Sequence, residues 1–221
     1  MDEFEMVSAA AALDQAKEME VAFQEFTHAY QEARQTRASS TPHLNLLDVF
    51  GLATRELRHS SALAWFLRAD AEHEQGSRFM AALLNLLGFP PPKDEHYTVH
   101  LEKPDRVDIA AVSSDEFAVF IENKVFAGEQ ETQFERLIDS LTAHADARGV
   151  PSQRRAAVFL TNDGREPATK PGSIHPSVLP FYLRRDVVID SFAKALAESP
   201  VKSPLLENLM KSYLHGISML K

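Results

Sequence analysis

The spacing of hydrophobic and polar positions along the chain changes near residue 97. Before that point, apolar residues recur every three or four positions, which is the spacing of one face of a helix. This spacing predicts helices at residues 5–35, within a block that begins at Asn45, and at residues 77–87. In the second block we expect Ser60 or Ser61 to cap a helix that carries apolar residues between positions 63 and 67.

From residue 97 onward, short apolar runs alternate with polar turns, which is typical of strands. The expected strands lie at residues 97–101, 106–112, 117–125, 156–160 and 178–183. The second and third are joined by a tight hairpin. Helices are expected at residues 130–147, 186–197 and from Ser203 onward, with Ser203 as cap and Pro204 at the first helical position. These elements predict an α/β fold with a mixed central β-sheet, flanked by helices on both faces, and an N-terminal helical region.

Three charged side chains interrupt the second and third expected strands. Asp108 stands in the first of these apolar runs, and Glu122 and Lys124 stand in the second. Successive strand residues point to opposite faces, so Glu122 and Lys124 project together, about 7 Å apart along the strand. The apolar residues at 117, 119 and 121 take the other face. We therefore expect this strand to bury one face only.

These residue types suit a site that holds a divalent metal ion and a water molecule. Mg²⁺ prefers oxygen ligands and keeps several waters, so Asp108, Glu122 and the backbone carbonyl of Asn123 would suffice. The metal ion would lower the pKa of a bound water, and Lys124 would orient that water. A purely structural Asp108 is disfavoured because an unpaired buried carboxylate is costly. For Glu122 and Lys124, a simple salt bridge is the alternative interpretation.

Further motifs surround this stretch in a fixed order. They are Glu56, His59-Ser60 and Trp65; His73 to Gly76; Arg106, Asp108 and Ile109; Ile121 to Val125; and Gln130 with Gln133. In this order, over about residues 44–137, they resemble the motifs of a poorly characterised family of the PD-(D/E)xK nuclease superfamily, which has a restriction-endonuclease-like core. One position departs from the resemblance, because Leu137 stands where such families often carry Tyr.

The resemblance implies a Mg²⁺-dependent nuclease that hydrolyses phosphodiester bonds, with Mn²⁺ as a substitute metal. It favours DNA over RNA as the nucleic-acid partner, and a role in defence or in mobile elements. It implies catalytic roles for Asp108, Glu122, Lys124, Glu56 and Gln133, and metal ligation by Asp108, Glu122, Asn123 and Glu56. In this interpretation Glu56 reaches in from its helix, and Gln133 positions phosphate or water.

Some of these residues have simpler interpretations when each is taken alone. Glu56, with an arginine on each side, would form an exposed salt bridge at a helix end. Gln130 and Gln133 would lie on a helix surface. His73 is expected to form hydrogen bonds within its loop and not to act as a ligand or base.

Composition changes this picture mainly at the N-terminus. The chain is 44% hydrophobic and 25% charged and has no cysteine, which indicates a folded protein without disulfides or thiolate sites. Its net charge is −9, but residues 1–33 hold eight acidic residues and one basic residue, which leaves the remainder near neutral. We therefore divide the chain into an acidic amphipathic helix with its linker, residues 1–40, and a nuclease-like domain, residues 41–221.

The acidic N-terminal helix has the apolar spacing of a heptad seam. It would pack on its own domain or pair, through residues 5–35, with a second copy or a partner protein. The second possibility leaves open a dimeric enzyme, or a catalytically silent binding or regulatory protein with the same fold. The apolar runs are far shorter than the ~20 residues of a membrane span, and the N-terminus does not resemble a signal peptide. No membrane partner and a cytoplasmic location are therefore expected.

Overall fold

The computed structural model describes residues 24–25, 28–29, 31–32, 51, 55–125, 132–168 and 175–219. The chain divides into two compact units, Met1–Leu44 and Asn45–Lys221, and each is considered by itself. In the first unit the described residues are helical, and the rest of the expected helix at 5–35 lies outside them. The division after residue 40 and a partner for this helix therefore stay predictions.

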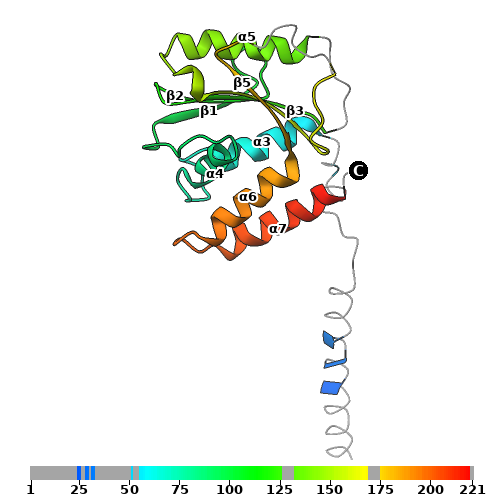
Figure 1. The fold of residues 1–221 in the computed structure, drawn as a ribbon. Helices are drawn as coiled ribbons and strands as arrows, with labels where there is room; N and C mark the ends of the chain where they lie inside the picture. The colour runs from blue at the N-terminus through cyan, green and yellow to red at the C-terminus, as the bar shows by residue number, and fades with distance from the viewer. Residues whose placement is uncertain are drawn as a thin grey trace, which may run out of the picture. The chain divides into compact units, whose positions relative to one another are not determined.

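Within the described residues of the second unit, five strands form one sheet (Figure 1). In spatial order they are β1 (Tyr97–Leu101), β2 (Ile109–Ser113), β3 (Ala118–Asn123), β4 (Arg155–Thr161) and β5 (Leu179–Arg184). The first three strands pair antiparallel, and β4 and β5 continue the sheet in parallel with β3. The predicted mixed sheet, and the hairpin between its second and third strands, are confirmed.

Helices lie on both faces of this sheet (Figure 1), as the sequence predicts. One face is covered by α5 (Gln133–Asp146). The other is covered by α3 (Glu56–Leu67), α4 (Arg78–Leu86), α6 (Arg185–Ala197) and α7 (Pro204–Ser218). A single 3₁₀ turn, Ser152–Arg154, leads into β4. None of the described helices combines the length and the apolar character that crossing a bilayer requires.

The central strand β3 is buried on both faces, which corrects the expectation of one buried face. Val119 and Ile121 pack into the core on the side of α3, whereas Ala118 and Phe120 pack under α5. A strand that lies between two helical layers is apolar along its whole length, so alternation is lost as a signal. Its polar residues are confined to its end.

Helix α3 begins earlier than the sequence predicts. Its first residue is Glu56, and the preceding Arg55 makes no capping side-chain hydrogen bond among the described residues. The expectation that Ser60 or Ser61 caps a helix is wrong. Their hydroxyls lie inside α3 and donate to the carbonyls of Glu56 (3.1 Å) and Leu57 (2.7 Å). Glu56 therefore occupies the exposed first turn, from which its side chain can leave the helix.

Two local predictions are confirmed. The hydroxyl of Ser203 accepts a hydrogen bond from the backbone N–H of Leu206 (3.3 Å), and Pro204 is the first residue of α7. His73 is buried, and its Nδ1 accepts from the N–H of Gln75 (3.0 Å) within its own loop, while its Nε2 lies 3.1 Å from the carbonyl of Phe66 near the end of α3.

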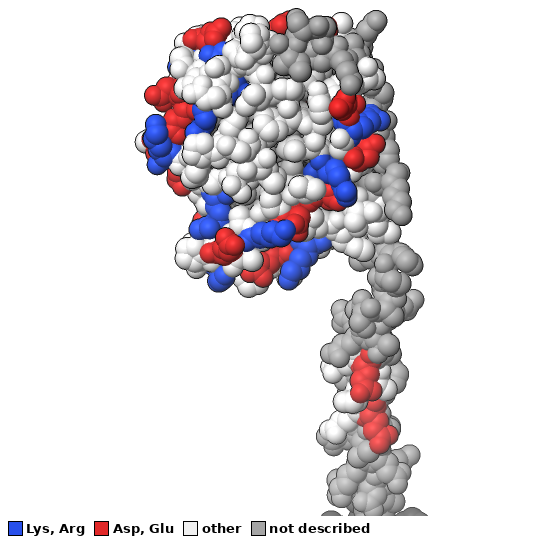
Figure 2. All heavy atoms as spheres, viewed as in Figure 1, with Lys and Arg blue, Asp and Glu red and all other residues white. Residues whose placement is uncertain are grey.

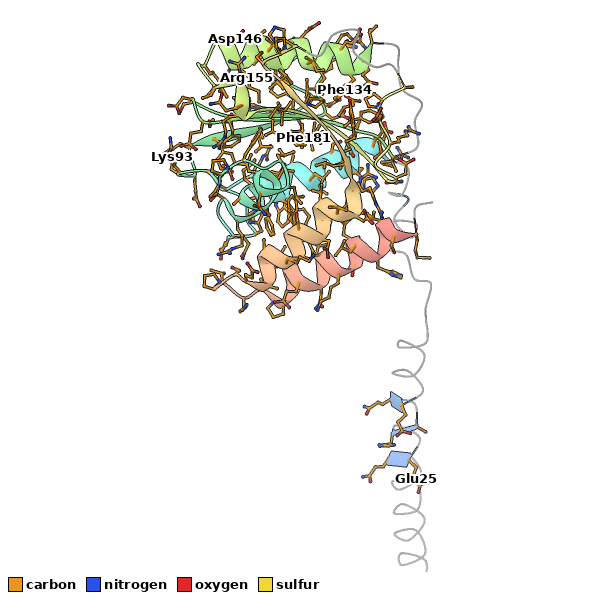
Figure 3. The ribbon with its side chains drawn as sticks, in the orientation of Figure 1. Glu25, Lys93, Phe134, Asp146, Arg155 and Phe181 are labelled. Atoms are coloured by element: carbon orange, nitrogen blue, oxygen red, sulfur yellow. The ribbon has the colours of Figure 1, made fainter. Side chains whose placement is uncertain are left out.

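We predict that Phe134→Ala lowers the free energy of unfolding by about 3–5 kcal/mol, because the fully buried ring joins α5 to the sheet. The ring centroid of Phe134 lies 5.8 Å from that of Phe159 and 6.1 Å from that of Tyr182 (Figure 3). Urea denaturation followed by circular dichroism measures the change. The control Leu205→Ala alters a residue that is 81% exposed and should cost less than about 0.5 kcal/mol. Equal losses would contradict this account of the core.

Candidate active site

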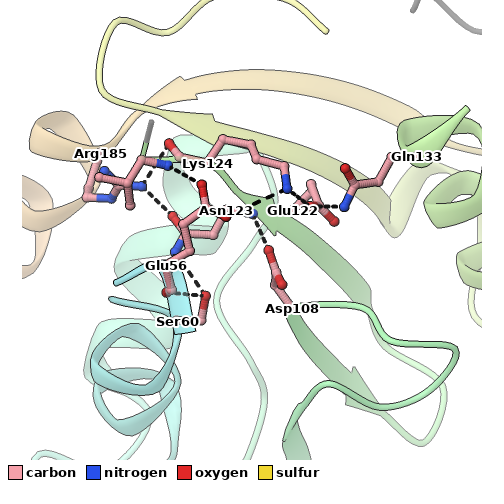
Figure 4. Close-up of polar contacts among 9 residues, drawn as sticks. Glu56, Ser60, Asp108, Glu122, Asn123, Lys124, Gln133 and Arg185 are labelled. Atoms are coloured by element: carbon pink, nitrogen blue, oxygen red, sulfur yellow. Dashed lines mark hydrogen bonds and ion pairs between the residues drawn. The ribbon is translucent and has the colours of Figure 1, made fainter. Parts of the chain in front are cut away.

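The polar ends of β2 and β3 meet at one edge of the sheet (Figure 4). Asp108 directly precedes β2, and Glu122 and Asn123 are the last residues of β3. Because Ile109 pairs with Ile121 in antiparallel register, the next position along the ladder sets Asp108 opposite Glu122. The backbone N–H of Asn123 donates to Oδ2 of Asp108 at 2.8 Å and ties the two strand ends together.

Glu122 and Lys124 share one side of the strand, as the alternation predicts. Nζ of Lys124 lies 2.9 Å from Oε1 of Glu122 and 3.8 Å from Oε2 of Glu56. The salt bridge foreseen as an alternative interpretation is present. The ammonium is, however, shared with a carboxylate from a helix on the other side of the sheet, so this is more than a pair within one strand.

Two further residues implied by the resemblance come to the same place. Glu56 reaches in from the first turn of α3, and its Oε1 accepts a hydrogen bond from the N–H of Val125 at 3.0 Å. Gln133 begins α5, and its amide Nε2 donates to Oε1 of Glu122. The structure thus brings Glu56, Asp108, Glu122, Lys124 and Gln133 together. Gln130 lies outside the described residues.

The side chain of Asn123 points to the opposite side of β3 and is completely buried. Its Nδ2 donates to the hydroxyl of Ser60 at 2.9 Å and more weakly to the carbonyl of Glu56 at 3.4 Å, while its Oδ1 accepts from Nη2 of Arg185 at 2.5 Å. The side-chain amide is therefore committed to the protein. If Asn123 contributes a metal ligand, the ligand is its backbone carbonyl.

Arg185 was not singled out by the sequence, although its guanidinium contacts Asn123 directly. It opens α6, sixty-two positions along the chain from that residue. The one available signal is that a cation in the first turn of a helix is disfavoured by the helix dipole and therefore needs another reason to be there. Periodicity alone does not reveal which residue it meets.

Burial dominates the electrostatics of this cluster. It raises the pKa of Glu122 to about 7, and the neighbouring charge of Asp108 adds to the effect, while Lys124 opposes it. The pKa of Asp108 is also raised by burial, against the hydrogen bond from Asn123. Burial alone would lower the pKa of Lys124, but the contact with Glu122 outweighs it and the pKa is raised. The ammonium of Lys124 therefore stays charged. Its single positive charge does not offset the effect of burial on the pKa of Asp108 and Glu122.

The donor set fits a hard divalent cation by its chemistry. Among the described residues, Glu56, Asp108 and Glu122 supply carboxylate oxygens around the single ammonium of Lys124, and oxygen is what Mg²⁺ prefers. Within the same described part of the chain, however, no three His, Asp or Glu side chains are arranged to hold a metal ion. A cation would have to compete with Lys124 for the oxygen of Glu122.

Two hollows border the cluster in the described part of the second unit. One, of about 600 Å³, is lined by Glu56 and Asp108 together with the exposed Arg55 and Arg58. The other, of about 460 Å³, is lined by Lys124, Thr161, Asn162, Asp163, Arg165, Arg184 and Asp186, among others. Glu56 and Asp108 thus line one hollow and Lys124 lines the other, and each hollow also contains arginine.

We predict that ionisation of Glu122 destabilises the protein in EDTA. Its pKa is about 7 in the fold against 4.5 for the ordinary group, so the protonated form favours folding, and this stability is lost as pH rises from 4.5 through 7. Glu122→Gln should therefore gain about 1–3 kcal/mol relative to the unmodified chain between pH 5 and pH 8. Thermal unfolding at both pH values measures this gain.

Glu198→Gln, at an exposed carboxylate of the same unit, is the matched control and should show no such trend. A stability difference for Glu122→Gln that is the same at pH 5 and pH 8 would contradict the raised pKa.

Comparison with known proteins places the chain in a family. No curated protein and no solved structure matches the chain. A family model described as the PD-(D/E)XK nuclease superfamily matches residues 44–214, a span that includes the whole cluster from Glu56 to Arg185. The chain belongs to the PD-(D/E)XK nuclease superfamily.

Proposed function

We propose that the protein is a Mg²⁺-dependent nuclease that hydrolyses phosphodiester bonds of DNA. The observation that carries this proposal is the convergence of Glu56, Asp108, Glu122 and Lys124, from one helix and two strands, at a single sheet edge. Membership of the superfamily supports nuclease activity as the class of reaction. DNA as the substrate, and a role in defence or in mobile elements, have the support of the sequence resemblance alone.

The contacts support a role for each residue in this proposal. Asp108, Glu122, Glu56 and the carbonyl of Asn123 would hold Mg²⁺ or Mn²⁺, which supplies a polarised water and offsets charge on the phosphate. Lys124 keeps its proton, so it can stabilise negative charge that develops on phosphate oxygens. Gln133 holds the carboxylate of Glu122 and would position it, or the phosphate beside it.

Exposed arginines in the two hollows support a polyanionic substrate. On the face shown in Figure 2, basic and acidic side chains of the described residues are interspersed over the Asn45–Lys221 unit. For contact with a polyanionic substrate, the basic groups next to the site therefore matter more than the net charge of the chain. Arg58 lines the hollow beside Glu56, and Arg165 lines the one beside Lys124. In this proposal both would contact phosphates of the substrate.

The test of catalysis is cleavage of supercoiled and linear DNA with Mg²⁺ or Mn²⁺, with RNA assayed in parallel. We predict that Asp108→Ala and Lys124→Ala each lower the cleavage rate by at least about 100-fold, because the first removes a proposed metal ligand and the second removes the ammonium proposed to stabilise charge on the phosphate. Glu198→Gln should cut at the unmodified rate. Equal cutting by the unmodified chain and both site variants would show that the cleavage comes from elsewhere.

The test of substrate contact is the salt dependence of DNA binding, measured in EDTA so that cleavage does not intervene. We predict that Arg58→Ala and Arg165→Ala each reduce the slope of log K against log salt by about 0.9, the value for one lost phosphate contact. Lys93→Ala is the control, because Lys93 pairs with Glu116 beyond the far end of β2 (Figure 3). Unchanged slopes for both arginine variants would remove these contacts from the proposal.

A catalytically silent binding or regulatory protein is the alternative function. It is motivated by the acidity and heptad spacing of residues 5–35, most of which lie outside the described residues. Calorimetric titration separates the two functions, because a silent protein would bind neither Mg²⁺ nor Mn²⁺ but would retain a stable partner in pull-downs. Light scattering with and without residues 1–40 tests the dimer. A cytoplasmic location stays a prediction.

A further inference from the structure

We propose that Arg185 is a positioning residue that fixes the end of β3 in the reactive cluster, an inference that rests on the proposed function. Arg185 is fully buried at the first position of α6. Its Nη2 donates to Oδ1 of Asn123 at 2.5 Å and to the carbonyl of Lys124 at 3.1 Å (Figure 4). One guanidinium nitrogen thus binds two consecutive residues of the proposed site.

The other terminal nitrogen of the guanidinium contacts the same part of the chain through Asn162. Nη1 of Arg185 donates to the side-chain oxygen of Asn162, which directly follows β4. The amide of Asn162 in turn donates to the carbonyl of Val125 at 3.2 Å. Arg185, directly and through Asn162, therefore holds three successive residues of the chain, from Asn123 to Val125. These are the residues that carry the proposed carbonyl ligand, the lysine and the N–H that holds Glu56.

The peptide of Lys124 is fixed from both sides. Its N–H donates to the carbonyl of Leu160 on β4 at 2.8 Å, and its carbonyl accepts from Arg185. With the backbone held in this way, the direction in which the lysine side chain leaves the strand is set. That direction points its ammonium to Glu122. Without Arg185, the carbonyl of Lys124 and the amide oxygen of Asn123 would each lose a charged donor.

A space-filling role alone does not explain Arg185, because burying its charge at this position costs free energy. Burial lowers its pKa, and its Nε has no hydrogen-bond partner among the described residues. The acceptors of its terminal nitrogens are neutral amide and carbonyl oxygens, and the charge of Glu56 offsets only part of the effect of burial, so the pKa stays lowered. A buried charge that is only partly offset costs free energy that an apolar side chain would not. We attribute this cost to the role of Arg185 in fixing the geometry of the end of β3.

The test compares Arg185→Lys and Arg185→Met with Phe192→Leu, a core substitution in the same helix. Arg185→Lys keeps the charge but cannot donate in two directions from one planar group, and Arg185→Met keeps the approximate volume. All three are assayed at temperatures where thermal unfolding shows each fully folded. If Arg185→Met does not fold, Arg185→Lys carries the test alone.

We expect both arginine variants to lower kcat by about 10- to 100-fold with little change in KM, and to weaken Mn²⁺ binding in calorimetry by a similar factor. Backbone hydrogen exchange at residues 123–125 should accelerate in both. Phe192→Leu should lose stability while retaining kcat, Mn²⁺ affinity and protection at these residues. Loss of kcat without any change in Mn²⁺ affinity or exchange would overturn the positioning role.

Failure of this inference is separable from failure of the proposed nuclease. If the unmodified chain cuts DNA and both arginine variants match it in kcat, metal affinity and exchange, the role of Arg185 is wrong and the nuclease stands. If the unmodified chain cuts no nucleic acid, the nuclease is wrong, and metal affinity and exchange still decide whether Arg185 orders the β3 end. Effects of Phe192→Leu equal to those of the arginine variants would also overturn the inference.

Discussion

Burial of charge at the end of a central strand is the constraint on which the rest of this structure depends. Glu122, Asn123 and Lys124 are 3%, 0% and 8% exposed, so solvent cannot satisfy them. Each must find its partner within the protein, and the partners come from α3, α5 and α6. Burial also raises the pKa of Asp108 and of Glu122, which makes the cluster receptive to a further positive charge.

Alternation along β3 separates the charged side chains from the amide side chain that holds the strand in place. Toward α5, Glu122 and Lys124 present the charged groups of the proposed site. Toward α3 and α6, Asn123 presents an amide that is held by Ser60 and Arg185. Because neighbouring strand residues share one backbone, fixing the amide side also fixes the side that carries Glu122 and Lys124. A strand buried on both faces can therefore carry charged groups on one face and their support on the other.

Much of the fold, and part of the site, could be predicted from local sequence. The strands follow the apolar runs, and the hairpin with period-two spacing brings Asp108 to Glu122 and sets Lys124 beside Glu122. Glu56 came only from the family resemblance, because its partners are far away in the chain. The start of α3 was missed because Arg55, which precedes it, makes no capping side-chain hydrogen bond among the described residues, and Arg185 was missed because the residue that it meets is set by tertiary packing.

The junction of β5 and α6 has a mechanical consequence. β5 ends at Arg184 and α6 begins at Arg185, so no loop absorbs movement between the edge strand and the guanidinium that holds Asn123. β5 is also the outermost strand beside β4, with one edge of its backbone free of strand pairing within the described residues. A shift of this strand along its axis would therefore be passed through Arg185 to Asn123 and the end of β3. The edge of the sheet and the charged cluster are mechanically connected.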